Sequence, residues 1–189
     1  MRWTLFMRIA FYPCCGSDLI LPLRLLNGLA DRLIFCDLRQ PDDQVWRRTL
    51  RGAKTPGAPS PKFVCSDATK ALRELECVHV LFYRNDSTGE GGSALRVWNR
   101  TFLLPFLERL PDDGGLIVTD GSNCWPKLFR RMNRPNGVEL YGWHLQPERA
   151  LQARNHGVFH SKGASVSQLV WLNVRANRKD LACPSTQIS

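Results

Sequence analysis

The sequence lacks several features that would assign it to a common class of protein. No window approaches 18 uncharged apolar residues, so no segment is expected to span a membrane. No CxxC pair occurs, which argues against a structural zinc site, and no metal site is predicted. The GK[ST] ending of a P-loop is also absent, which argues against a nucleoside-triphosphate cradle. With 189 residues, the chain is long enough for one well-buried domain and too short for two of ordinary size.

A disulfide framework is not expected either. The seven cysteines are odd in number and scattered, and they include the adjacent pair Cys14 and Cys15, which cannot easily bridge each other. This pattern favours free thiols in a reducing compartment, so we predict a cytoplasmic protein. Arg8 interrupts the apolar run at the start of the chain, which is interpreted as the first strand rather than as a signal peptide.

Acidic residues are scarce in the last third of the chain. Residues 1–120 hold 16 Lys and Arg against 14 Asp and Glu, whereas residues 121–189 hold 10 against 3, so most of the net charge of +9 lies there. In "WPKLFRRMNRP", helical i,i+4 spacing pairs Lys127 with Arg131 and Arg130 with Arg134. These four residues are candidates for contact with an RNA or DNA backbone. The alternative is a solvated helix face that keeps the protein soluble.

Apolar runs alternate with helical patterns along most of the chain. Strands are predicted at "LFMRIAFY", "RLIFCDL", "KFVCSD", "VHVLFYRN", "GGLIVTDG", "ELYGWHL" and "QLVWLNV". Helices are predicted at residues 21–30, at 67–76 with Asp67 or Thr69 as the cap, and at 94–110, where Pro105 should kink or divide the helix. Such alternation predicts an α/β fold, a mainly parallel sheet with helices on both faces.

Two segments fall outside this alternation. Residues 51–62 carry three prolines and two glycines and are predicted to form a long connection between the second and third strands. Residues 176–189 are predicted to be a weakly ordered tail after a single domain that spans residues 1–175.

Aspartates follow four consecutive predicted strands. Asp37, Asp67, Asp86 and Asp120 end the second to the fifth strand. In an open parallel sheet, ligands bind beyond the carboxyl ends of the strands, so these side chains should line one crevice. Gly16 in the turn after the first strand lies 21 residues before Asp37, close to the distance between a glycine turn and a ribose-binding carboxylate. Each aspartate could instead be a turn or cap residue.

This order of elements resembles the class I S-adenosylmethionine-dependent methyltransferases, over roughly residues 5–175. The resemblance implies a Rossmann-like three-layer sandwich with a seven-stranded sheet whose last strand is antiparallel. It also implies that the loop "YPCCGSD", with Tyr12, Cys15 and Gly16, wraps the methionine part of the cofactor. Asp37 in "FCDL" would hold the ribose, and Asp67 in "VCSDA" would reach the adenine amino group.

The chain departs from that family in two places. The acidic residue and glycine series usual in the first loop are replaced by Tyr12, Pro13, Cys14 and Cys15, and only Gly16 remains. No Asn-Pro-Pro-Tyr or Asp-Pro-Pro-Tyr follows the fourth strand, which disfavours an adenine-DNA methylase. The catalytic candidates are Asp86 and Asp120, which lie where metal-dependent O-methyltransferases of the family hold magnesium.

Two functions therefore stay open from the sequence. One is a methyltransferase that uses S-adenosylmethionine and acts on nucleic acid or another anionic substrate. The other is a catalytically silent domain of the same fold that binds nucleic acid or a protein partner. The retention of Asp37 and Asp67 favours cofactor binding, whereas the loss of loop glycines favours the silent domain. A membrane partner is not expected.

Overall fold

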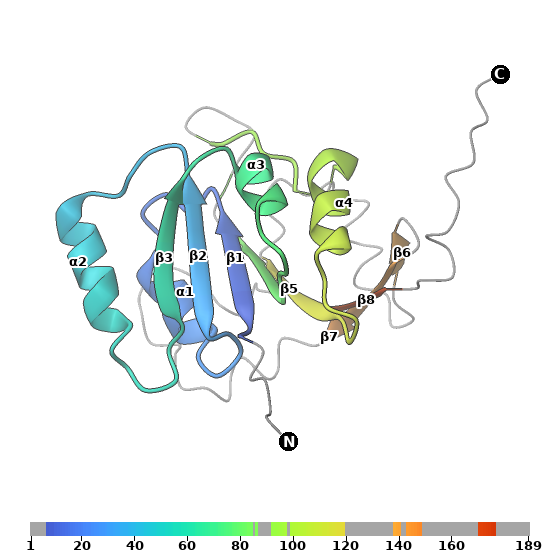
Figure 1. Cartoon of the computed structure of the whole chain (residues 1–189), viewed down its shortest axis with the longest axis horizontal. Coiled ribbons are helices and arrows are strands. Elements are labelled where there is room, and N and C mark those ends of the chain that lie inside the picture. Colours follow the sequence, from blue (N-terminus) through green and yellow to red (C-terminus); the bar gives the residue numbers. More distant parts are fainter. Residues whose placement is uncertain are drawn as a thin grey trace.

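A computed structural model shows one sheet with helices on both faces (Figure 1). It describes residues 7–84, 86, 92–97, 99–119, 138–140, 143–148 and 170–176. The strands are β1 (Ile9–Pro13), β2 (Arg32–Asp37), β3 (Ser60–Cys65), β4 (Val80–Tyr83), β5 (Gly115–Thr119), β6 (Val138–Leu140), β7 (Trp143–Glu148) and β8 (Val170–Ala176). The helices are α1 (Ile20–Leu25), α2 (Asp43–Gly52), α3 (Ala68–Arg73) and α4 (Arg100–Glu108).

The strand order in the sheet is β3-β2-β1-β4-β5-β8-β7-β6. The five strands from β3 to β5 are parallel, as the alternation of strands and helices predicts. β8 runs antiparallel to both of its neighbours, β5 and β7. Strands β1 to β3 extend the sheet in one direction and β4 and β5 in the other, so the order reverses between β1 and β4. In doubly wound sheets, a reversal of this kind opens a crevice for a ligand.

One predicted strand is divided in the structure. The run "ELYGWHL" contributes to two strands, β6 and β7, which pair antiparallel with Leu140 opposite Trp143. The sheet of the described residues therefore has eight strands rather than seven. Only Tyr141 and Gly142 separate the paired residues, and a glycine inside an apolar strand pattern is a common signal for such a break.

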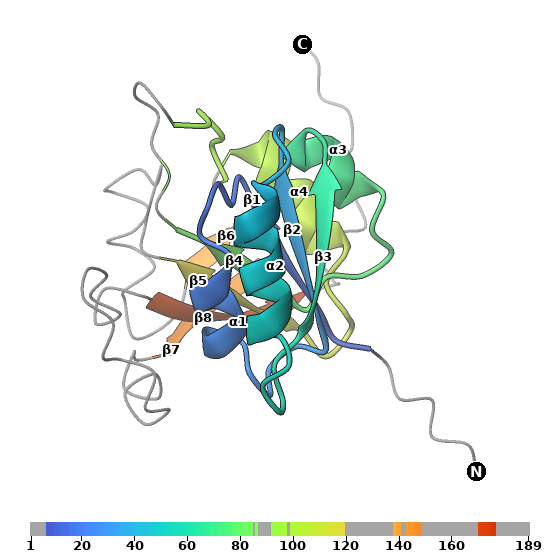
Figure 2. The same ribbon diagram turned by 90° about the vertical axis from the view of Figure 1, so that its left-hand side faces the viewer.

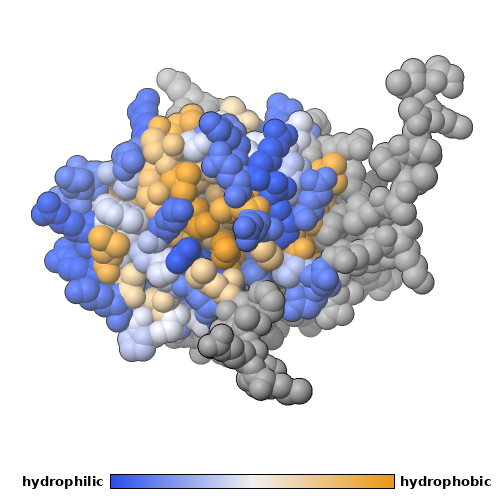
Figure 3. Space-filling view, viewed as in Figure 1, coloured by the Kyte–Doolittle hydropathy of each residue, from blue (hydrophilic) through white to orange (hydrophobic). Residues whose placement is uncertain are grey.

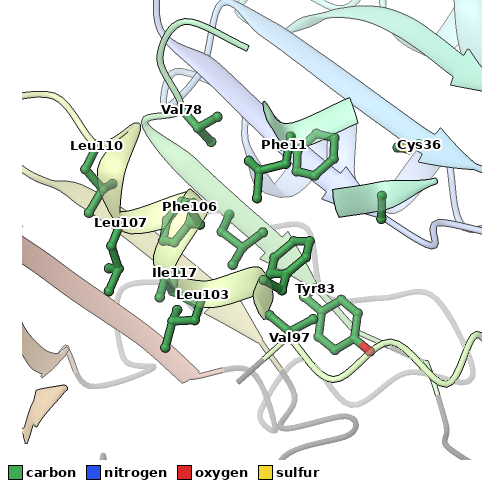
Figure 4. Packing of buried hydrophobic residues seen from close by; sticks show 14 of the residues in the cluster. Phe11, Cys36, Val78, Tyr83, Val97, Leu103, Phe106, Leu107, Leu110 and Ile117 are labelled. Atoms are coloured by element: carbon green, nitrogen blue, oxygen red, sulfur yellow. The ribbon is translucent and has the colours of Figure 1, made fainter. Parts of the chain in front are cut away.

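Alternating side chains of the central strands form two separate cores. Phe11 belongs to the core beneath α3 and α4, whereas its neighbour Tyr12 belongs to the core beneath α1 and α2. In the first core, Phe106 and Leu103 of α4 point toward Ile117 of β5 (Figure 4). This two-sided burial explains why β1, β2 and β4 are almost continuously apolar in sequence.

The helices differ from expectation mainly at their ends. α3 begins after Asp67, whose carboxylate accepts a hydrogen bond from the amide of Lys70, so the cap is Asp67 and not the alternative, Thr69. α1 ends at Leu25, earlier than predicted, and turns that include Gly28 at φ +72° follow it. Helix α2 was not predicted, because only Val45, Trp46 and Ala53 provide apolar contact with the core from its inner face.

The predicted helix over residues 94–110 is wrong in its first third. α4 begins at Arg100, after the cap Asn99, and runs through Pro105 without being divided. The preceding residues are held out of the helix by side chains. The amide of Leu95 donates to Oγ of Ser93 over 3.0 Å, and its carbonyl accepts from the hydroxyl of Tyr83 over 3.1 Å. Helical periodicity is thus overridden by contacts made with β4.

Among the described residues, no helix is long and apolar enough to cross a bilayer. The five cysteines in this part of the chain are all free thiols, as predicted. Of the predicted tail over residues 176–189, Ala176 is the last residue of β8, and residues 177–189 lie outside the described residues.

Candidate functional site

A cleft of about 840 Å³ opens at the carboxyl ends of β1 to β4. Its volume lies within the range of small-molecule sites, which is about 300–1,000 Å³. Its walls come from the loop after β1, the turns after β2 and β3, and the segment that leads into α4. The described lining residues are Tyr12, Cys14, Cys15, Gly16, Ser17, Asp18, Asp37, Leu38, Arg39, Ser66, Asp67, Ala68, Asp86, Gly92, Ser93, Ala94 and Leu95.

The cleft brings together most of the residues that the sequence selected. The five cofactor-binding candidates and one catalytic candidate line it: Tyr12, Cys15, Gly16, Asp37, Asp67 and Asp86. The second catalytic candidate and the basic candidates for nucleic-acid contact lie outside the described residues: Asp120, Lys127, Arg130, Arg131 and Arg134.

Asp37 fastens the first loop to the end of β2. Its Oδ2 accepts a hydrogen bond from the amide of Gly16 over 3.0 Å, and its Oδ1 accepts from the amide of Arg39 over 3.3 Å. The amide of Cys15 donates to the carbonyl of Cys36 over 3.2 Å. The loop is therefore held against β2 by its backbone, and Asp37 still has lone pairs for a ligand because a carboxylate offers about four acceptor sites.

Two residues of the first loop adopt left-handed backbone conformations. Cys14 has a φ of +53°, which is uncommon for a residue other than glycine. Gly16 follows at φ +50°, and a Cβ placed there would meet nothing within 4 Å. A left-handed cysteine costs on the order of 1–2 kcal/mol, a strain that the hydrogen bonds to β2 offset.

Beneath this loop lies a largely buried ion pair that was not predicted from the sequence. Nε of Arg84 donates to Oδ2 of Asp18 over 2.7 Å, and the two side chains are 7% and 20% exposed. The hydroxyl of Tyr12 lies 3.0 Å from the same carboxylate oxygen and 3.2 Å from the carbonyl of Arg84. Burial and the charge of Asp18 hold the pKa of Tyr12 well above its ordinary range. The first loop is thus tied to the end of β4 as well as to β2.

A signal for this pair exists in the sequence. Arg84 follows the four apolar residues of β4 directly, and Asp18 stands two residues after Gly16 in the first loop. Oppositely charged residues at the ends of neighbouring strands can be expected to meet, but only once β1 and β4 are known to be adjacent.

Asp67 caps helix α3 with one carboxylate oxygen and leaves the other available to accept a hydrogen bond. Its Oδ1 accepts the hydrogen bond of the amide of Lys70, over 2.9 Å. Its Oδ2 has no hydrogen-bond partner among the described residues, and the side chain is exposed at the cleft. Asp67 could therefore accept a hydrogen bond from an exocyclic amine without giving up the helix cap.

Asp86 is heavily engaged by its own surroundings. Its carboxylate accepts hydrogen bonds from the amide of Ser93 over 2.8 Å, from the hydroxyl of Ser93, and from the hydroxyl of Tyr83 over 2.7 Å. These contacts fix the backbone that leads through Ala94, at φ +57°, toward α4. Asp86 shapes this wall of the cleft, whatever further part it takes.

The thiols around the cleft are poor nucleophiles. The pKa of Cys14 is raised to about 12, mainly by burial and with contributions from the negative charges of Asp86, Asp37 and Asp67, although a hydrogen bond with Ser93 opposes the rise. Burial likewise raises the pKa of Cys36 to about 12 and that of Cys15 above its usual range. Thiol attack needs the thiolate, so these groups serve as small packing residues.

Two further lining residues were missed by the sequence analysis. Leu38 is 72% exposed, the highest value among the large apolar residues of the described chain that stand out from the core, and Arg39 follows it at the rim. An exposed leucine next to Asp37 offers an apolar surface for a flat ring. Within the described ranges, no group of three metal-ligating side chains is close enough to hold an ion.

No protein-family model and no curated protein matches the sequence. The chain is similar to solved structures at low identity. An rRNA methylase from Streptococcus thermophilus is 11% identical, with 90% of this chain and 88% of that chain covered and a TM-score of 0.47. A methyltransferase from Geobacter sulfurreducens is 11% identical, with 90% of this chain and 71% of that chain covered and a TM-score of 0.49. A protein from Streptococcus mutans in complex with SAH is 12% identical, with 88% of each chain covered and a TM-score of 0.48.

Proposed function

We propose that this chain binds S-adenosylmethionine in the cleft and is a methyltransferase-like protein. The observation that supports this most is the convergence of the first loop, Asp37 and Asp67 on one cleft beside the β1/β4 reversal. The family resemblance of the sequence assigns these groups to the methionine, ribose and adenine parts of one ligand.

The residues of the cleft suit the parts of this cofactor. Asp37 would accept hydrogen bonds from the ribose hydroxyls, and Asp67 through Oδ2 from the adenine amino group. Leu38 would cover the adenine ring. The backbone at Cys15 and Gly16 would pass close to the methionine part, because Gly16 leaves open space there. When bound, the cofactor supplies an activated methyl group.

The charge of the cleft also supports this ligand. Three lining carboxylates, Asp37, Asp67 and Asp86, act together on the thiol of Cys14, whereas the positive charge of Arg84 is paired with Asp18. A ligand with a positive sulfonium and an ammonium group would find favourable electrostatics there, since charges interact strongly over a few ångströms in a partly desolvated cleft.

We further propose that seven of the eight strands correspond to the methyltransferase sheet, with β8 as its antiparallel strand and the short β6 as an addition. For catalysis, Asp86 and Asp120 remain the candidates. The contacts of Asp86 with Ser93 and Tyr83 support a positioning role, because its carboxylate already accepts three hydrogen bonds. The methyl acceptor proposed is a nucleic acid or another anionic substrate, approached through Lys127, Arg130, Arg131 and Arg134.

The proposal is tested by calorimetry with S-adenosylmethionine and with SAH. We expect one site per chain in the wild type and loss of binding in Gly16→Val, because valine would project into the open space that Gly16 leaves. Gly28→Val is the matched control. Gly28 also has a positive φ, +72°, and also leaves open space, but it lies outside the cleft lining. Equal affinity in the wild type and Gly16→Val would reject the proposed site.

A silent domain of this fold is the second candidate, and the glycine-poor loop and the engaged carboxylate of Asp86 favour it. Both candidates could bind the cofactor, and they differ in whether the methyl group is transferred to an acceptor. Incubation with S-adenosylmethionine carrying a tritiated methyl group, together with RNA or DNA, separates them. Label in the nucleic acid supports an enzyme, whereas cofactor binding without transfer to any acceptor supports the silent domain.

A further inference from the structure

The outer face of α2 carries a cluster of cations, and the nearest acidic residues in sequence, Asp42 and Asp43, stand only at the start of the helix. Residues 44–62 contain five lysines and arginines and no acidic residue. The four that lie on or just after α2 are exposed: Arg47, Arg48, Arg51 and Lys54. Within the described residues, the ion pairs involve Arg8, Arg84 and Arg109 and none of these four. This set of four is called the α2 basic face below.

The orientation of α2 is fixed by aromatic packing on its other side. The ring of Trp46 packs edge-on against Phe35 of β2, at 6.5 Å between centroids, and against Phe63 of β3, at 6.0 Å. Thr49, one turn later, is fully buried. With 3.6 residues per turn, Arg47 and Arg51 then lie on the side away from the sheet. Rotation of α2 to hide these side chains would expose Trp46.

The face is open and extends to the cleft. Figure 2 shows α2 in front of the sheet, with no other helix or strand between it and the viewer. In Figure 3, hydrophilic residues gather over the side of the molecule where Figure 1 places α2. Arg39, which lines the cleft, precedes the cap residue Asp42 by three positions. A chain lying along α2 would therefore pass near the mouth of the cleft.

We infer that the α2 basic face is a docking surface for the phosphate backbone of a single-stranded nucleic acid. Phosphodiester chains offer repeated negative charge and make few shape demands, which suits exposed, flexible cations. Helix α3 shows by contrast what a balanced surface looks like. Its Lys70 and Arg73 are followed closely by Glu74 and Glu76.

The test is fluorescence anisotropy with a labelled 20-nucleotide RNA of mixed sequence and with the matching single-stranded DNA, at several salt concentrations. Arg47→Glu/Arg51→Glu is compared with Lys70→Glu/Arg73→Glu, which changes the net charge equally on α3. We expect the α2 variant to weaken binding at least tenfold and to reduce the slope of log K against log salt by about 1.4, at about 0.7 per phosphate contact. The α3 variant should weaken binding less than threefold.

Several results would overturn the inference. One is that the wild type does not bind the RNA or the DNA at low salt, and another is that the α2 and α3 variants weaken binding equally. A third is that poly-glutamate of matched charge competes for the protein as well as unlabelled nucleic acid does, which would indicate an acidic protein partner. Arg47→Gln/Arg51→Gln gives a milder change if the reversed charges disturb folding. Binding to the RNA alone would indicate an RNA partner, whereas equal binding to both would indicate that either nucleic acid can dock. Calorimetry with SAH on the same variants keeps this test separate from the proposed function, because α2 lies outside the cleft lining.

Discussion

Asp37 has a structural task in the chain before any ligand arrives. It accepts hydrogen bonds from the amides of Gly16 and Arg39, and these hold the first loop beside β2. A ligand hydroxyl would add to this arrangement rather than create it. The cradle is thus preorganised by the same carboxylate that is proposed to bind the ribose, which lowers the cost of ordering on binding.

Asp37→Ala should therefore weaken binding of S-adenosylmethionine at least tenfold in calorimetry. A charged acceptor contributes on the order of 1.5–3 kcal/mol per hydrogen bond, and the freed loop adds to the loss. Asp37→Asn retains one acceptor oxygen and should lose less affinity. Asp42→Ala is the control, because Asp42 caps α2 through the amide of Gln44 and removal of such a cap costs about 1 kcal/mol of stability. If Asp37→Ala binds like Asp42→Ala, Asp37 is only a turn residue.

The buried thiols make stability fall at alkaline pH. In the folded chain the pKa of Cys36 is raised to about 12, whereas an unfolded thiol ionises near 9.0. Between these values the unfolded state loses its proton first, so the free energy of unfolding decreases as pH rises from about 9 toward 12. Cys14 and Tyr12, with pKa values also raised, act in the same direction.

Urea unfolding in the presence of a reductant checks this prediction. The midpoint should be level at pH 7–8 and should decline above about pH 9, as the free energy of unfolding falls by on the order of a few kcal/mol in total. Cys36→Ala should show a shallower decline. A midpoint that stays constant to pH 10.5 would mean that these thiols are more solvated than the fold indicates.

At the scale of elements, the Arg84–Asp18 pair joins the end of β4 to the first loop. Removal of one partner from a buried pair leaves an uncompensated charge, so Arg84→Met should cost about 3 kcal/mol, near the lower end for such pairs because Asp18 is partly exposed. In an Asp18→Asn background the same substitution should cost at least about 1 kcal/mol less. Urea unfolding of the four proteins of this cycle measures the coupling.

The exposed pair at the other end of the sheet provides the control. Arg8 and Asp31 lie 3.0 Å apart and are each 44% exposed, so Arg8→Met should cost less than about 1 kcal/mol. Equal costs for Arg8→Met and Arg84→Met would show that burial contributes nothing to the linkage of the loop to β4.

The elements show what the sequence could predict and what it could not. The parallel strands were predictable because both of their faces are buried, as in β2 and β4. The position of Asp37, Asp67 and Asp86 in one cleft was also predictable, because the carboxyl ends of parallel strands lie at the same edge of a sheet. Helix α2 was missed because few of its residues are apolar. The start of α4 and the φ angle of Cys14 depend on contacts with β4 and β2, which are distant in sequence.

At the scale of the molecule, charge is separated by location as well as by sequence segment, as the described part of the chain shows. Carboxylates gather in the cleft, and cations gather on α2. Residues 1–120 are nearly balanced in composition, so their totals conceal this separation. A small cationic ligand and a polyanion would therefore be drawn to different places on one surface, and neither would compete for the other's site.

The position of β8 also bears on how the chain is made. Thr119 of β5 pairs with Val170 of β8, and β7 and β6 join the sheet only through β8. At a synthesis rate of about 5–20 residues per second, β5 emerges about 3–10 s before its partner. For that interval a nascent chain carries the parallel half of the sheet with the β5 edge uncovered, and exposed edges of this kind invite pairing with other chains. Translation speed between codons 119 and 170 should thus influence the yield of folded protein.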